Sequence, residues 1–355
     1  MGLDNKIKKE LFLILVHSSM AFFLFLPMIG YAAQPVITSV TGTVQNRQIL
    51  TITGSNMIDE DKTNWDSFFT SHENASGFEG ASPAEDGYII PNSPGMQFWW
   101  EPVYDGSMKL LGNQSIHFHT QGSSPSILTS YVAMSHHLPK LEDIWVRFYA
   151  KWIYKVRPYS HIKMIDTFGG PYQSYFQPSA GFDWLVATAH ARYASGTPKP
   201  FHNGDDIYYP FSIEQDRWYE FELHFRNKSG QPYIFDTWMD GKQITWGVVS
   251  RENSFRTLML GIINQRQKDS RAIMDHWWDG FAVSSSRIYP ACTIEISNNP
   301  AYGEKNIKYQ EPVYLSDSLI RFRLDVEGLG KGPFYLWVTN NRQERSKPYT
   351  FEELQ

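Results

Sequence analysis

The chain has 355 residues, a formal net charge of −5 and a single cysteine, Cys292. This weakly acidic balance argues against a nucleic-acid partner, because nucleic-acid-binding domains are normally basic. One cysteine excludes an intramolecular disulfide and a cysteine-based zinc site, so packing has to stabilise the fold. The length leaves room for two domains.

The first segment has the charge order of a secretory signal. Three lysines within the first nine residues precede an apolar run over residues 11–29, and small residues end it. We therefore expect a signal peptide over residues 1–33, a secreted or periplasmic mature chain, and no membrane span in that chain. The alternative is an uncleaved membrane anchor, because the run approaches the roughly 20 residues that cross a bilayer.

Segments of alternating β-branched and aromatic residues follow along the whole remaining chain, and each is bounded by turn residues. The expected strands are VITSV (36–40), ILTITG (49–54), SIHFHT (115–120), WVRFYAKW (145–152), HIKMID (161–166), DWLVATA (183–189), WYEFELHF (218–225), YIFDTWMDG (233–241), TLMLGII (257–263), WWDGFAVSS (277–285), LIRFRLD (319–325) and PFYLWVTN (333–340). Asp240-Gly241 is a strong hairpin turn pair. One short helix is expected around residues 140–144. The pattern predicts an all-β protein, a sandwich or a barrel.

The middle of the chain, residues 59–290, reads as one unit. It contains a W-x-E-x-E-x-H strand over 218–224, a W-x-D-G strand over 238–241 and a closing strand, DGFAVSSSRI, over 279–288. These strands resemble concanavalin A-like jelly rolls, the superfamily of legume-type lectins, glucanases and several polysaccharide lyases. The resemblance implies a jelly-roll sandwich that binds polysaccharide. The two-carboxylate strand of the laminarinase-like glucanases is absent, which counts against a retaining glycosidase.

The two ends of the chain carry a second pattern. Residues 35–57 resemble the first strands of an IPT-type immunoglobulin-like domain, and CTIEIS, VYLSDSLIRFRL and GPFYLWVTNNRQERS resemble its remainder. We therefore predict one smaller immunoglobulin-like domain, built from residues 34–58 and 291–355 and split by the jelly roll, since insertion at a loop tip is tolerated. The alternative is a short N-terminal extension followed by an independent C-terminal domain.

Strand parity sorts the polar residues into faces, because successive side chains point to opposite sides of a sheet. Arg147, Tyr149 and Lys151 share one face of their strand, and cationic or polar faces recur on other strands. On an acidic protein such faces suggest a groove for an anionic polysaccharide. The predicted substrate-binding residues are Lys151, Trp184, His190, Arg192, Glu222, His224, Asn264 and Arg266. The alternative is a wet outer sheet face without a ligand.

If the groove is catalytic, cleavage of a uronic-acid polymer by β-elimination is the simplest chemistry, and the resembled superfamily includes such lyases. It needs a group that neutralises the carboxylate, a base and an acid. The predicted catalytic residues are Arg147, Tyr149, His161 and Lys163, with Arg147, Asn264 or Arg266 as the neutralising group, His161, Lys163 or His224 as the base, and Tyr149 as the acid. The strings Q-I-H and Y-x-K-x-G-x-Y of the alginate lyase group are absent. The sequence leaves binding, cleavage and surface adhesion open.

His117 and His119 share a strand face, but no carboxylate lies near them in sequence, so we expect no metal there. His136 and His137 are expected in a loop. Asp205 and Asp206 are expected in a solvated turn, with a structural calcium ion in their loop as the alternative; no other cofactor is expected.

Two adjacent tryptophans, Trp277 and Trp278, lie in the closing strand. Adjacent residues of a strand face opposite ways, so we expect one in the core and the other exposed or covering a sheet edge.

Overall fold

The computed structural model describes residues 34–58, 103–121, 130–141, 143–155, 165–168, 172–179, 184–191, 207–210, 214–226, 233–245, 248–249, 255–265, 273–303, 307–330 and 332–351. These residues form strands, turns and bends arranged in four antiparallel sheets, so the predicted all-β class is confirmed. Residues 34–355 form one compact unit. The predicted signal peptide and the Asp205–Asp206 loop lie outside the described residues. Within the described part, no helix is long and apolar enough to cross a bilayer.

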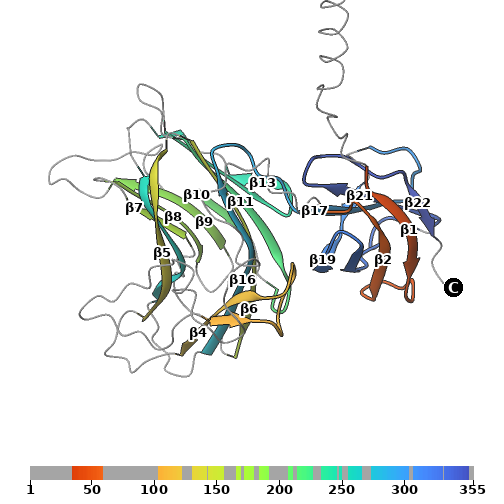
Figure 1. Ribbon diagram of the computed structural model, residues 1–355, viewed down its shortest axis with the longest axis horizontal. Helices are drawn as coiled ribbons and strands as arrows, with labels where there is room; N and C mark the ends of the chain where they lie inside the picture. The colour runs from red at the N-terminus through yellow and green to blue at the C-terminus, as the bar shows by residue number, and fades with distance from the viewer. Residues whose placement is uncertain are drawn as a thin grey trace, which may run out of the picture. The chain divides into compact units, whose positions relative to one another are not determined.

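Two large sheets form the layers of a sandwich (Figure 1). The six-stranded sheet has the order β10 (Ile207–Pro210), β9 (Trp184–Ala191), β8 (Tyr172–Ser179), β7 (Ile165–Phe168), β15 (Phe255–Gln265) and β5 (Ser130–Leu141). The eight-stranded sheet has the order β13 (Lys242–Thr245), β12 (Tyr233–Met239), β11 (Tyr219–Arg226), β6 (Asp143–Tyr154), β16 (Ile273–Ser284), β4 (Ser115–Gln121) and β3 (Val103–Asp105), with β14 (Val248–Val249) beside β12. Two layers of antiparallel strands are what the predicted jelly roll requires.

The apolar side chains on one face of the eight-stranded sheet form the core of this sandwich. Phe148 of β6 stacks on Trp278 of β16, with ring centroids 4.3 Å apart, and on Phe221 of β11 at 5.2 Å. All three rings are buried. Such aromatic pairs add to the free energy that their buried area already contributes.

The N-terminal strands pair with strands from the far end of the chain. One small sheet has the order β1 (Val36–Thr41), β2 (Ile49–Ser55), β20 (Leu319–Arg323) and β19 (Glu311–Leu315), and the other has the order β18 (Lys308–Tyr309), β17 (Cys292–Ser297), β21 (Phe334–Asn340) and β22 (Tyr349–Phe351). In the first of these, Leu50 pairs with Phe322 and Ile52 with Ile320. The predicted split domain needs this pairing; its immunoglobulin-like character stays a prediction.

One of three local predictions, the turn at Asp240 and Gly241, is confirmed, and the predicted helix and loop are wrong. Asp240 and Gly241 have positive φ values of 50° and 74°, the backbone of a tight hairpin turn between β12 and β13. The helix expected around residues 140–144 is wrong, because β5 ends at Leu141 and β6 begins at Asp143. His136 and His137 lie in β5 and not in a loop. Long-range pairing of β5 with β15 and of β6 with β11 overrides the weak local helical preference.

Candidate functional site

The polar face of β6 is an interior face. Arg147 is 3 % exposed, and its Nε and Nη2 atoms donate to the carbonyl oxygen of Gly280 at 3.2 and 3.0 Å, while Nη1 donates to that of Tyr289 at 3.3 Å. A bulge in β16 between Asp279 and Ala282 lies at this carbonyl. The guanidinium therefore binds backbone oxygens of its own chain.

Tyr149, the predicted general acid, is 1 % exposed, and its hydroxyl oxygen accepts a hydrogen bond of 2.9 Å from the backbone N–H of Ala291. Burial raises the pKa of this hydroxyl well above its ordinary value. Both side chains have interior contacts, and Tyr149 also lines the pocket described below, so their catalytic role stays a prediction.

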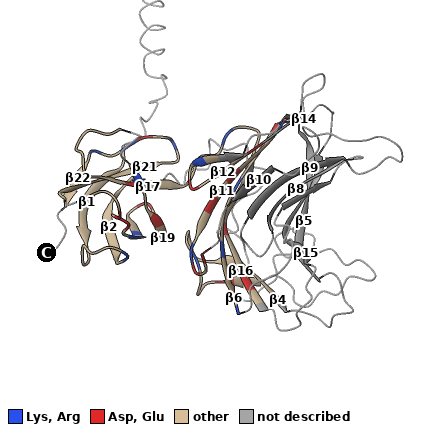
Figure 2. Ribbon diagram, turned by 180° about the vertical axis from the view of Figure 1, so that it is seen from behind, with Lys and Arg blue, Asp and Glu red and all other residues tan. Residues whose placement is uncertain are grey.

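Two glutamates of β11 share this buried face (acidic positions are red in Figure 2). Glu222 accepts a hydrogen bond of 3.0 Å from Arg287 Nε, and Glu220 accepts one of 3.3 Å from the backbone N–H of Gly241. Burial raises the pKa of both carboxyls, and the charge of Glu222 raises that of Glu220 further. Glu222, predicted to bind substrate, is 1 % exposed and pairs with an arginine of the same chain.

His224 and Lys151, also predicted to bind substrate, have acidic partners within the chain. His224 Nε2 lies 2.6 Å from an oxygen of Asp143, and its ring stacks on Trp145 with centroids 3.9 Å apart. Lys151 Nζ lies 2.6 Å from Asp216, and both predicted residues are less than a tenth exposed. These contacts account for the cations of this face without a ligand.

The remaining predicted residues are not in the described strands of the eight-stranded sheet. Trp184 and His190 lie in β9 and Asn264 lies in β15, all in the six-stranded sheet. Arg192, Arg266, His161 and Lys163 lie outside the described residues. The described members of the predicted set are thus divided between two sheets.

Backbone pairing in the six-stranded sheet aligns its positions in rows that cross five strands. Two alternate rows are mostly polar: His190, Gln173, Phe168, Thr257 and His137, then Thr188, Tyr175, Asp166, Met259 and Ser135. Between these two rows lies a mixed row, with Ala189, Ser174, Thr167, Leu258 and His136. The row that follows the second polar row is apolar, with Ala187, Phe176, Ile165, Leu260 and Met134. Rows two apart belong to the same face of a sheet.

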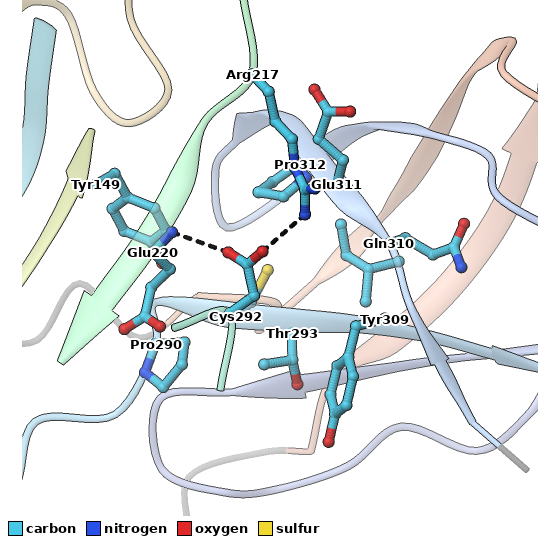
Figure 3. A pocket seen from close by; sticks show the side chains of 12 residues that line it. Tyr149, Arg217, Glu220, Pro290, Cys292, Thr293, Tyr309, Gln310, Glu311 and Pro312 are labelled. Atoms are coloured by element: carbon cyan, nitrogen blue, oxygen red, sulfur yellow. Dashed lines mark hydrogen bonds and ion pairs between the residues drawn. The ribbon is translucent and has the colours of Figure 1, made fainter. Parts of the chain in front are cut away.

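A pocket lies beside the buried glutamates (Figure 3). Its charged wall is an internal network: Asp240 accepts hydrogen bonds from Arg217 Nη2 at 2.7 Å and from the backbone N–H of Glu220 at 3.0 Å, the two contacts dashed in Figure 3. The wall on the other side comes from β17, β18 and β19, with Cys292 and Tyr309 among its residues. Burial raises the pKa of the Cys292 thiol, so this thiol is protonated and poorly nucleophilic.

Sequence reasoning missed one cluster. His117 and His119 of β4 face Asp275 of β16, whose Oδ1 atom lies 2.9 Å from His117 Nε2 and 2.7 Å from His119 Nδ1. The carboxylate, which is absent from the neighbouring sequence, comes from a strand more than 150 residues away. Trp277 and Trp278 are 7 % and 1 % exposed, so both are buried, and the alternative in which one of them is exposed is wrong.

No family model and no curated protein matches the chain, but several solved structures are similar to it. The chain is similar to an endo-β-1,4-glucuronan lyase from the fungus Trichoderma reesei, at 10 % identity and a TM-score of 0.45 over 59 % of this chain and 95 % of that one. It is similar to the alginate lyase Aly36B, at 8 % identity and a TM-score of 0.45 over 61 % and 96 %. The cellulose-induced protein Cip1 matches at 13 % identity and a TM-score of 0.45 over 62 % and 100 %. Likeness at this level carries no conclusion about the ligand of this chain.

Proposed function

We propose that the large sandwich binds an anionic polysaccharide across the polar rows of the six-stranded sheet. The observation that carries the proposal is the alternation of rows: two mostly polar rows of one parity cross five strands, and the neighbouring row of the opposite parity, from Ala187 to Met134, is apolar. Five strands at a spacing of about 4.8 Å span about 20 Å, the scale of an extended oligosaccharide. Histidine, tyrosine, glutamine and threonine are side chains that hydrogen-bond or stack on sugars.

Two further observations support this choice of sheet. The polar side chains on one face of β6 and β11 are buried and bind other groups of the same chain. The six-stranded sheet is therefore the one to test first. Cations also flank its strands in sequence: Arg192 directly follows β9, Arg266 directly follows β15, and Lys163 precedes β7 by two residues. Positive charge at strand ends favours an anionic polymer.

Affinity electrophoresis through gels that contain a uronan, a sulfated glycan or a neutral glucan tests the proposal. We expect retardation by the anionic polymers, and we expect Trp184→Ala and His190→Ala to weaken it, because each removes an aromatic ring that a sugar can stack on. Arg321→Ala is the control, because Arg321 is exposed on β20 of the smaller sheets.

Retardation that is unchanged in Trp184→Ala and His190→Ala would contradict the assignment of this face. Cleavage by β-elimination is read in the same samples from unsaturated products, which absorb in the ultraviolet. Appearance of that absorbance would make the protein a lyase, and its neutralising group and its acid would then have to be sought outside the buried pair Arg147 and Tyr149.

A further inference from the structure

The cluster of His117, His119 and Asp275 has the composition and spacing of a metal site. One ligand atom from each side chain can be chosen so that all three lie within 4.8 Å of one another. Neighbouring ligands of a tetrahedral ion such as Zn²⁺, each about 2.1 Å from the metal, are about 3.4 Å apart. The two nitrogen–oxygen separations here, 2.9 and 2.7 Å, are shorter, so an ion would fit once the rings and the carboxylate move apart by about 0.5 to 0.7 Å.

The surroundings hold the first histidine in one orientation. The indole of Trp277 stacks on the ring of His117, with centroids 4.6 Å apart and planes 7° apart. The indole N–H in turn donates to Asp105 Oδ2 at 2.7 Å, which fixes the tryptophan. Hydrogen bonds from Ser107 and Trp277 keep the pKa of Asp105 below its usual range although burial opposes them, so this second carboxylate adds negative charge beside the rings. Support of this kind behind the ligands is typical of metal sites.

Access and charge also suit an ion. The side chains of His117, His119 and Asp275 are 23 %, 28 % and 29 % exposed, so solvent can supply further ligands. Asp275 is the carboxylate that both imidazoles contact, and a carboxylate oxygen is a ligand that zinc takes. The neighbouring His276 faces the other side of β16, is fully buried and stacks on Trp152, so it is not a further ligand.

We propose that His117, His119 and Asp275 bind one divalent transition-metal ion of the Zn²⁺ type, with water in the remaining positions. Two imidazoles and one carboxylate are a ligand set that zinc takes in proteins, whereas calcium and magnesium prefer oxygen ligands alone. Binding replaces the hydrogen bonds between the rings and Asp275 by bonds to the metal. Each ring then carries its proton on its other nitrogen.

Isothermal titration of the chelator-treated full chain with Zn²⁺ tests the proposal, with Ca²⁺ and Mg²⁺ as comparison ions. We expect one saturable Zn²⁺ site per chain and none for the other two ions. Asp275→Asn and His119→Gln preserve side-chain size, and each should weaken Zn²⁺ binding by more than the roughly 10–100-fold that changes outside the ligand shell cost.

His224→Gln is the matched control, because His224 also contacts two carboxylates on the same sheet, Asp143 at 2.6 Å and Asp236 at 3.6 Å, but is in no such cluster with a second imidazole among the described residues. It should retain Zn²⁺ binding. Modification of the unaltered protein by diethylpyrocarbonate, located by mass spectrometry, does not depend on how the variants fold. Zn²⁺ should protect His117 and His119. Absence of a saturable site, or modification of both histidines at the same rate with and without Zn²⁺, overturns the proposal.

Discussion

Glu220 and Glu222 show what burial does to a single carboxyl group. Among the described residues, no hydrogen-bond donor reaches Glu220 Oε1 or Glu222 Oε1, although both oxygens are buried. Burial is the largest cause of the raised pKa of both groups, while Arg287 and Arg147 act against it at Glu222. The folded chain therefore binds protons at these carboxyls more tightly than the unfolded chain does.

The sign of the pH dependence follows from linkage. A carboxyl whose pKa is raised on folding contributes stability that is fully present below the unfolded value of about 4.5 and is lost as the pH rises through the folded pKa. We expect the free energy of unfolding to fall between pH 5 and pH 8. Glu220→Gln should reduce this slope and raise stability at pH 8 by about 1–3 kcal/mol, the cost of a buried polar group without a partner. Urea denaturation at several pH values measures both effects.

Glu327→Gln serves as the control for that experiment, because Glu327 is exposed. The pKa of Asp105 and of Asp275 is lowered, and stability from such groups is lost only as the pH falls through their folded pKa values, below the chosen range. A slope that Glu220→Gln leaves intact would show that this carboxyl does not carry the pH dependence.

At the scale of the element, the bulge in β16 connects the sheet to the buried arginine. Gly280 has a φ of 53°, a region that residues with a Cβ rarely adopt, and its carbonyl oxygen accepts two hydrogen bonds from Arg147. A Cβ at this position would lie 2.5 Å from Leu111 Cδ1 and 3.0 Å from Tyr149 Cδ2. Both the backbone conformation and the space around it therefore require glycine.

Gly280→Ala is accordingly expected to destabilise the chain by about 1–3 kcal/mol from strain alone, with overpacking in addition. Gly241→Ala is a matched control, because Gly241 also has a positive φ, 74°, but nothing lies within 4 Å of its Cβ position. Thermal unfolding of both variants separates the two causes. Equal losses in the two variants would show that only the backbone conformation matters.

At the scale of the whole molecule, strands from the two ends of the chain share one apolar core. Leu50 and Ile52 of β2 and Ile320 and Phe322 of β20 are completely buried, and they belong to a cluster that includes Tyr149 of the large sandwich. The bridge between Leu111 and Leu315 adds a further connection. Residues near the N-terminus should therefore affect stability near the C-terminus.

Ile52→Ala tests this coupling and is expected to cost about 2–5 kcal/mol. Val36→Ala is the control, since Val36 is 51 % exposed on the adjacent β1, and surface changes of this kind stay within about 0.5 kcal/mol. Hydrogen exchange followed by mass spectrometry should show faster exchange in β20 and β21 for Ile52→Ala only. Unaltered exchange there would favour a dispensable N-terminal extension.

The sequence by itself determined the all-β class, most strand positions and the Asp240–Gly241 turn, because strand periodicity and turn conformation are properties of neighbouring residues. It also sorted Arg147, Tyr149 and Lys151 correctly onto one face of β6. Only the tertiary structure decided that this face is buried. Arg147 donates to the backbone oxygens of Gly280 and of Tyr289, which follows β16, and backbone oxygens have no sequence signature. The same holds for His117 and His119: their carboxylate partner, Asp275, is brought beside them by the pairing of β4 with β16, and strand pairing across such a separation leaves no local trace in the sequence.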